Sequence, residues 1–136
     1  LDTVIEELRA FNPDIVGFSE ASWTKATGSA AEKLAKALKL EFQYARANPW
    51  FPGQTKEQSD ETVKLIGFEE GELILSRYPI LRYERKALNP RTSESGEGRA
   101  ALHVVAKLPG GAGEIDVFIT HLTGADHAEP RGKFRK

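Results

Sequence analysis

The six residues DIVGFS at 14–19 limit the folds open to this chain more than any other stretch. They are apolar on both faces of an extended segment, whereas a strand with one face in water alternates apolar and polar residues. A strand of this kind lies inside a sheet that is covered on both sides. The chain is therefore expected to build a layered structure rather than a single open sheet.

Two amphipathic helices are predicted to flank this strand. The first covers residues 2–11, with a capping box formed by Thr3 and Glu6. The second begins at another capping box, formed by Ser29 and Glu32. The opening order is thus helix, strand, helix.

The rest of the chain is rich in β-type patterns. Strands are predicted at 42–47, 62–68, 72–76, 80–88, 99–108 and from 114 to His121. Loops are predicted at 48–61 and 89–98, and a hairpin turn at 109–113. The sequence contains no repeat or second domain. One domain of the α/β (α+β) class is therefore expected, with a mixed β-sheet layered with helices.

Composition narrows the functions open to the chain. Its 136 residues carry 19 Lys and Arg against 20 Asp and Glu, so no global positive field favours nucleic acid. Without cysteine there is no disulfide framework, zinc-finger site or thiol nucleophile, and a metal would need oxygen ligands and histidine. No apolar run is long enough to cross a membrane, which predicts a soluble protein.

Two polar residues stand at the ends of buried strands. Glu20 follows the strand at 14–19, and His121 ends the apolar run at 114–120. Sites gather at such strand ends, so the two side chains would converge if their strands are neighbours in one sheet. A carboxylate beside an imidazole suits Mg²⁺-assisted attack on phosphorus. The alternatives are a helix cap or a salt bridge to Lys25 for Glu20, and a satisfied strand-end histidine for His121.

The other two histidines are interpreted differently. His103 shares one face of the predicted strand with Arg99 and Lys107, opposite the apolar face, and is expected to be structural. His127 lies in a predicted loop and is expected to be a surface residue.

Four segments occur in order along the chain: NPDIVGFSEA, GELILSRYPI, GRAALHVVAKLPGG and VFITHL. They resemble motifs of the endonuclease/exonuclease/phosphatase superfamily, which has the deoxyribonuclease I-like fold. The resemblance covers the N-terminal half of such a domain and implies about half of a four-layer α/β/β/α sandwich. It matches Glu20 to the family's metal-binding glutamate, with Mg²⁺ or Mn²⁺ as the cofactor. His121 matches the histidine of the Thr-His-Leu motif, which contacts the phosphate.

The resemblance suggests further site residues. Some relatives hold an acidic partner of the histidine just before the LILSRYPI strand, and Glu70 or Glu72 could match it, or form only a charged turn. Arg99 resembles the arginine before the family's next strand, and could touch substrate or brace the loop at 89–98. Four basic residues could follow phosphates or form one face of a helix: Arg131, Lys133, Arg135 and Lys136.

The function that the resemblance implies is a fragment of a divalent-metal-dependent phosphoesterase, in which water attacks a phosphodiester or phosphomonoester. The family's asparagine-bearing first strand and its Asp-x-Asn and Asp-His motifs are not found, and the chain has no methionine, even at position 1. Residues 1–136 are therefore expected to form a single incomplete domain, inactive by itself. The alternative is a non-catalytic binding or interaction module with the same fold.

Partners follow from the same resemblance. A phosphate-ester substrate is implied, with nucleic acid, phospholipid and small molecules all open, because this fold serves many substrates. Self-association through apolar surface left bare is also expected. A cytoplasmic location is preferred, and export is left open.

Overall fold

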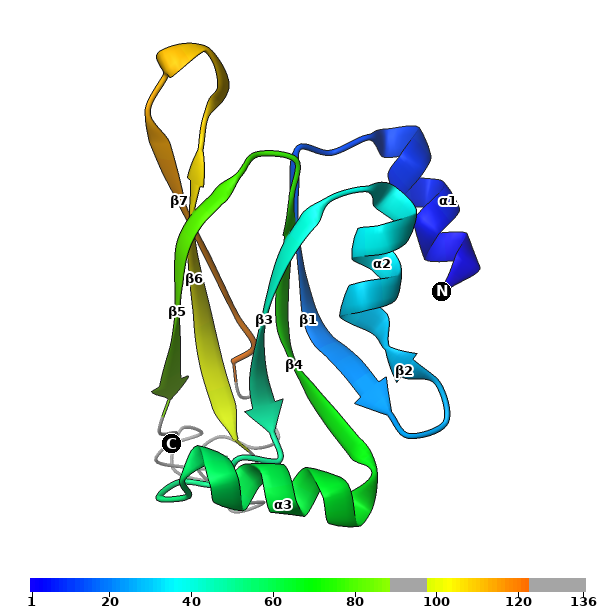
Figure 1. Cartoon of the computed structure of the whole chain (residues 1–136), viewed down its shortest axis with the longest axis vertical. Coiled ribbons are helices and arrows are strands. Elements are labelled where there is room, and N and C mark those ends of the chain that lie inside the picture. The colour runs from blue at the N-terminus through cyan, green and yellow to red at the C-terminus, as the bar shows by residue number, and fades with distance from the viewer. Residues whose placement is uncertain (89–97, 123–136) are drawn as a thin grey trace, which may run out of the picture.

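The structure is a computed structural model of the chain, and it describes residues 1–88 and 98–122. Its elements follow one another as shown in Figure 1: α1 (Asp2–Phe11), β1 (Ile15–Thr24), β2 (Gly28–Ser29), α2 (Ala30–Leu38), β3 (Glu41–Asn48), α3 (Lys56–Ile66), β4 (Phe68–Ser76), β5 (Ile80–Leu88), β6 (Arg99–Lys107), the 3-10 helix η1 (Pro109–Gly111) and β7 (Glu114–Thr120). The α/β class expected from the sequence is confirmed.

The strands form two sheets that pack face to face. The first sheet has the order β2-β1-β4-β3, and the second has the order β5-β6-β7. Within the described part of the chain every strand pairing is antiparallel. The helices α1 and α2 cover the outer face of the first sheet, and α3 crosses one end of the sandwich (Figure 1). The layers are therefore helix, sheet and sheet.

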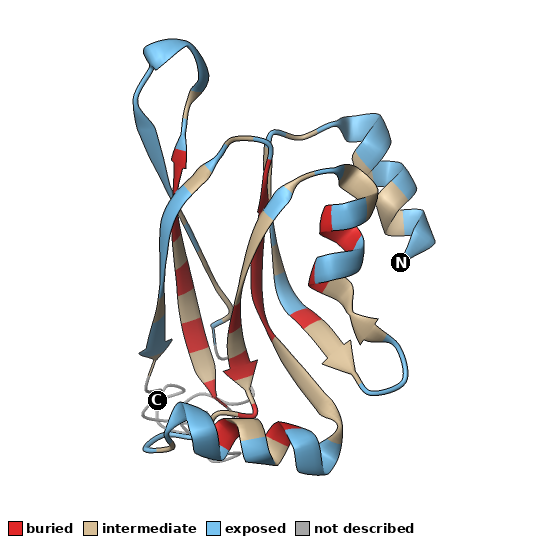
Figure 2. Ribbon diagram, viewed as in Figure 1, coloured by how far each residue is buried: buried red, intermediate tan, exposed pale blue. Residues whose placement is uncertain are grey.

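Two apolar clusters hold these layers together. Leu73 and Leu75 of β4 pack against Leu34 of α2 in the helix-facing cluster. Ile74, between them, points the other way and packs against Leu102 of β6 in the cluster between the sheets. Because neighbouring side chains of a strand point to opposite faces, β4 is buried on both sides from Gly71 to Ser76, the part drawn in red in Figure 2.

The strand predicted at 14–19 packs on both faces, but its residues are only half-buried or exposed, and the strand continues to Thr24. Phe18 packs against the helix-facing cluster, and Ile15 against the cluster between the sheets. A Cβ atom on Gly17 would lie 2.7 Å from Cδ1 of Ile119 in β7. Glycine at this position therefore lets the two sheets approach closely.

The prediction for residues 48–68 was wrong in one important respect. The part assigned to a loop at 48–61 and a strand at 62–68 contains α3. This helix begins with a capping box, in which the Thr55 hydroxyl accepts from the Gln58 backbone N–H and the Gln58 side chain accepts from the Thr55 N–H. Only Ser59 and Val63 of the helix are buried, so its apolar stripe is too narrow to dominate the sequence pattern.

The capping boxes predicted for the first two helices have different outcomes. In α1 the N-cap is Leu1, which makes no side-chain cap hydrogen bond, so the box of Thr3 and Glu6 was wrong. In α2 the Ser29 hydroxyl accepts from the Glu32 backbone N–H, and the helix begins where predicted. No helix within the described ranges is long and apolar enough to cross a membrane.

Candidate functional site

Glu20 lies at an irregularity inside β1 rather than after the end of the strand. The register between β1 and β4 runs regularly to the pair of Phe18 and Leu73 and resumes at Ala21. Ser19 and Glu20 therefore lie opposite the single residue Glu72, which is the arrangement of a β-bulge. Such bulges are enriched next to active sites, where they redirect a side chain.

The backbone of Glu20 is held in an unusual conformation. Its φ angle is 59°, in the left-handed region that residues other than glycine rarely adopt. Backbone strain of this kind persists only where the surrounding structure imposes it, and it gathers at functional sites. The bulge therefore marks Glu20 as a candidate site residue. Its carboxylate is accessible, because the side chain is 59% exposed.

His121 follows β7 and meets Glu20 across the sandwich. Its Nδ1 atom lies 3.3 Å from Oε1 of Glu20, and its side chain is 37% exposed. The convergence of the two residues was expected from the sequence, but for a different reason. Their strands are not neighbours in one sheet: β1 belongs to the first sheet and β7 to the second. It is the face-to-face packing of the sheets that brings the two side chains together.

Glu72 lies beside this pair and is almost fully buried, with 1% exposure. Burial raises the pKa of its carboxyl group, and the nearby Glu20 charge adds to that rise. A hydrogen bond with Ser19 and the positive charges of His121 and Arg99 act in the opposite direction. The Oε2 atom of Glu72 has no hydrogen-bond partner among the described residues.

Glu70 was the other candidate for the acidic partner of the histidine. It lies two residues before Glu72 on β4 and pairs there with Ser22 and Asn48. The negative charge of Glu70 raises the pKa of Tyr44. In the described part of the chain no ion pair joins Glu70 to His121. The structure therefore brings Glu72, and not Glu70, next to the pair of Glu20 and His121.

Arg99 begins β6 at the same end of the sandwich. Its positive charge lowers the pKa of Glu72, so it shares the electrostatic environment of the site. It also lines a cavity of about 200 Å³ together with Trp50 and Phe51. The indole ring of Trp50 carries the guanidinium of Arg85 on its face, 3.7 Å from the ring centroid.

Ser19 and the aromatic residues near Arg99 were not predicted as site residues. Ser19 was assigned as the last residue of the strand at 14–19, and nothing in that short segment indicates where a bulge will fall. Trp50 and Phe51 lie in the segment assigned to a loop. Two aromatic residues next to Pro52 in a polar loop were the sequence feature that could have indicated them.

His103 lies away from this site, on the outer face of the second sheet. Its ring stacks on Phe118, with centroids 4.2 Å apart, and its Nε2 atom lies 2.7 Å from Oδ1 of Asp116. These contacts agree with a structural role. His127 lies outside the described residues, as do the four basic residues Arg131, Lys133, Arg135 and Lys136.

The donor atoms of the site are few. Among the described residues no group of three or more histidine, aspartate and glutamate side chains could hold a metal ion by itself. Glu20 is the exposed carboxylate, His121 is the partly exposed imidazole, and Glu72 is the buried acid beside them. This arrangement can bind a hydrated cation through one carboxylate and an oxyanion through an imidazole.

Comparison with solved structures identifies the fold. The chain is similar to an endonuclease/exonuclease/phosphatase from Beutenbergia cavernae, with a TM-score of 0.68, 23% identity, and coverage of 90% of this chain and 33% of that one. It is also similar to an endonuclease/exonuclease/phosphatase family protein from Leptotrichia buccalis, with a TM-score of 0.61, 10% identity, and coverage of 90% and 47%.

The human Nocturnin catalytic domain, in a structure with bound sulfate anion, is similar as well, with a TM-score of 0.60, 17% identity, and coverage of 90% and 41%. No protein-family model matches the chain, and no curated protein matches it. The chain therefore has the fold of endonuclease/exonuclease/phosphatase proteins, as the sequence motifs implied, and spans between a third and about half of the length of these three structures.

Proposed function

We propose that this chain supplies part of the active site of a divalent-metal-dependent phosphoesterase. The observation that carries the proposal is the approach of Glu20 Oε1 to His121 Nδ1, 3.3 Å apart, at a strained bulge. The two residues come from different sheets, so the fold itself creates the site. That fold is the one found in solved endonuclease/exonuclease/phosphatase proteins, which supports the reaction class.

The residues present fit a Mg²⁺ or Mn²⁺ ion that keeps much of its water. Mg²⁺ is commonly held by one or two carboxylates, with water and substrate phosphate oxygens completing its shell. Glu20 offers one exposed carboxylate. The Oε2 atom of Glu72 is a buried acceptor with no partner among the described residues, and it could orient a ligand of the ion. When bound, the ion would neutralise charge that develops on the phosphate oxygens.

The residues of the chain would act on the phosphate as follows. His121 directs Nδ1 toward Glu20, so Nε2 faces away from the carboxylate and, in the doubly protonated ring, would donate a hydrogen bond to a phosphate oxygen. The buried carboxyl group of Glu72 lies close to both His121 and Arg99, whose charges lower its pKa. Arg99 supplies a positive charge at this end of the sandwich. These groups bind and orient the ester for attack by water.

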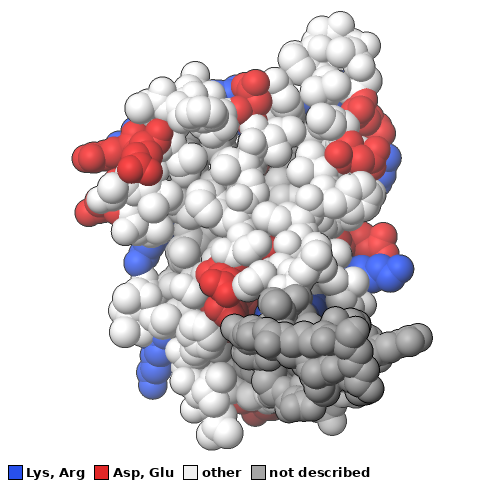
Figure 3. All heavy atoms as spheres, turned by 180° about the vertical axis from the view of Figure 1, so that it is seen from behind, with Lys and Arg blue, Asp and Glu red and all other residues white. Residues whose placement is uncertain are grey.

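The proposed substrate class is a phosphate ester. The Nocturnin structure holds sulfate, a tetrahedral anion with the shape of phosphate, which agrees with an oxyanion site on this fold. Lys and Arg are scattered on the face shown in Figure 3, and they form no broad basic patch over its described residues. The whole chain carries 19 Lys and Arg against 20 Asp and Glu, and a long duplex needs many phosphate contacts, so recognition confined to one or a few phosphates is favoured.

The metal site can be tested without measuring catalysis. Mn²⁺ added to the isotopically labelled chain should broaden the NMR signals of Glu20, Ala21 and His121 first, because broadening by a paramagnetic ion falls steeply with distance. Glu20→Gln removes the charged ligand and should abolish this local broadening. Glu84→Gln removes an exposed charge of β5 in the second sheet and should leave it unchanged. An unaltered pattern in Glu20→Gln would rule out Glu20 as a ligand.

A further inference from the structure

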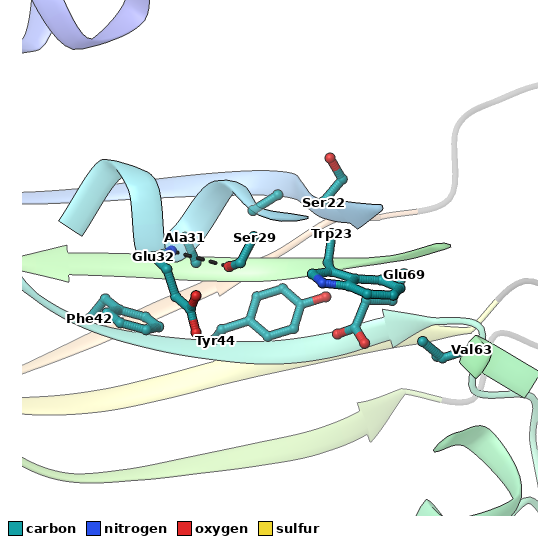
Figure 4. A pocket seen from close by; sticks show the side chains of 10 residues that line it. Ser22, Trp23, Ser29, Ala31, Glu32, Phe42, Tyr44, Val63 and Glu69 are labelled. Atoms are coloured by element: carbon teal, nitrogen blue, oxygen red, sulfur yellow. Dashed lines mark hydrogen bonds between the residues drawn. The ribbon is translucent and has the colours of Figure 1, made fainter. Parts of the chain in front are cut away.

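A second cavity lies on the other side of the first sheet, beneath α2. Its volume is about 280 Å³, and its walls come from β1, α2, β3 and β4 (Figure 4). Ala21, which follows Glu20 on β1, belongs to the helix-facing core and lines this cavity. The cavity and the pair of Glu20 and His121 are therefore separate features, and nothing in the proposed phosphoesterase chemistry uses the cavity.

The walls combine aromatic rings with acidic groups. Trp23, Phe42 and Tyr44 supply three rings, and Glu32 and Glu69 supply two carboxylates. In Figure 4 the Tyr44 hydroxyl and the Glu69 carboxylate lie beside the Trp23 ring, and Glu32 lies between Phe42 and Tyr44. Among the described residues that line the cavity there is no lysine, arginine or histidine.

The two carboxylates differ in how far they are already neutralised. Glu69 accepts a hydrogen bond from Arg46, with an Nη2 to Oε2 distance of 2.9 Å, and Arg46 is not one of the lining residues. Glu32 is exposed at the rim, and no ion pair joins it to another described residue. The cavity therefore keeps an uncompensated negative charge at its edge.

The hydroxyl of Tyr44 adds a polar group inside the cavity. Its oxygen is buried, and the nearest acceptor for its proton is the Glu69 carboxylate. Burial and the nearby Glu69 raise the pKa of Tyr44, so the hydroxyl keeps its proton and does not add a third negative charge. A hydroxyl that donates its proton to a carboxylate keeps its oxygen free to accept a hydrogen bond from a bound ligand or water.

Charge and shape together select the class of occupant. The faces of aromatic rings carry partial negative charge and attract cations, and carboxylates add to this attraction while they repel anions. A purely apolar ligand would bury the carboxylate and hydroxyl groups without compensation. The volume lies just below the range of drug-sized ligand pockets, so the occupant is small.

We propose that this cavity binds a small organic cation, a quaternary or protonated amine held between the rings of Trp23, Phe42 and Tyr44 beside Glu32 and Glu69. The ring faces contact the alkyl groups that surround the charged nitrogen. The carboxylates balance its charge, and the Tyr44 hydroxyl oxygen accepts a hydrogen bond from a polar arm of the ligand.

Fluorescence of the single remaining tryptophan can test this proposal. The chain has two tryptophans, and Trp50→Phe leaves Trp23, in the cavity wall, as the only one. Choline should change the fluorescence of this variant with saturation. Its neutral isostere 3,3-dimethylbutan-1-ol, with carbon in place of the charged nitrogen, should bind roughly 10-fold more weakly, as expected when cation–π and charge attraction are lost.

Two charge-matched variants in the same background identify the site. Glu32→Gln should weaken choline binding about 2- to 5-fold, the scale of one partly exposed charge interaction, and leave the neutral isostere unaffected. Glu84→Gln, in the second sheet, should change neither ligand. Equal affinities for choline and its isostere would overturn the proposal. So would the absence of a saturable signal for choline, or a Glu32→Gln affinity no weaker than that of Glu84→Gln.

Discussion

At the scale of single residues, Glu72 is the most deeply buried ionisable group in the described part of the site. It is an ionisable group with 1% exposure, and one of its oxygens has no hydrogen-bond partner among the described residues. Burial of a charged carboxylate is unfavourable, while His121, Arg99 and Ser19 favour its ionised form. The balance leaves the pKa of Glu72 above its usual value of 4.5. Its effect on stability should therefore depend on pH.

Replacement of Glu72 by glutamine should show this dependence. A carboxyl group whose pKa is higher in the folded than in the unfolded state stabilises the fold below pH 4.5, and loses that contribution as the pH rises through the folded pKa. The free energy of unfolding of the original chain, relative to Glu72→Gln, should thus be smaller at pH 8 than at pH 4. Urea unfolding of both proteins at these pH values measures the difference. A constant difference would contradict the expected direction.

Glu20 and His121 are site residues that could be predicted from the sequence alone. Polar residues that end apolar runs stood out from the sequence, and the structure does bring these two together. The bulge at Ser19 and Glu20 could not be predicted, because it depends on the register with β4, a strand some fifty residues further along the chain. The choice between Glu70 and Glu72 depends on the same register, so the sequence left it open.

At the scale of elements, α3 depends more on its capping than on its apolar face. Only two of its residues are buried, so packing contributes less to it than to α2. Its first turn is instead fixed by the reciprocal hydrogen bonds of Thr55 and Gln58. Arg46 of β3 ties the helix to the first sheet through Asp60, with an Nη1 to Oδ1 distance of 2.7 Å.

Removal of the Thr55 hydroxyl should therefore destabilise the chain measurably. Thr55→Ala deletes the acceptor for the Gln58 N–H, and we expect a loss of about 1 kcal/mol, within the range of 0.5 to 2 found for N-cap residues. Thr3→Ala is the matched control, because α1 is not capped by Thr3, and it should change the free energy of unfolding by less than about 0.5 kcal/mol. Equal losses for the two variants would show that the Thr55 cap contributes nothing particular.

Strongly patterned elements were predictable, and weakly patterned ones were not. The strands β5 and β6 were placed correctly within a residue or so, because β6 alternates buried residues such as Leu102 and Val104 with half-exposed ones. The capping box of Thr55 and Gln58 was visible in the sequence, but the polar surface of α3 and the prolines before it resembled a loop.

At the scale of the whole molecule, the site exists only because two sheets pack face to face. Ile74 and Leu102 join them in the shared core, and Gly17 lets them approach at Ile119. Glu20 and His121 lie 101 positions apart in the chain (121 − 20), so their geometry depends on the entire sandwich. The chain nevertheless covers only 33% to 47% of the three structures whose fold it shares, and self-association of the chain stays a prediction.

We expect the 136-residue chain alone to show no metal-dependent hydrolysis of bis-p-nitrophenyl phosphate. Its described residues include no group of three metal-binding side chains, so a Mg²⁺ ion would be held by Glu20 mainly through its own water shell. Precise positioning can lower the barrier of such a reaction by about 7 to 11 kcal/mol, and this contribution is lost when catalytic groups are incomplete. The rate with Mg²⁺ and protein should equal the rate with Mg²⁺ alone, even in samples where Mn²⁺ broadens the signal of Glu20. Hydrolysis that requires Mg²⁺ and disappears in Glu20→Gln would contradict this expectation, and would show that the chain already carries a working site.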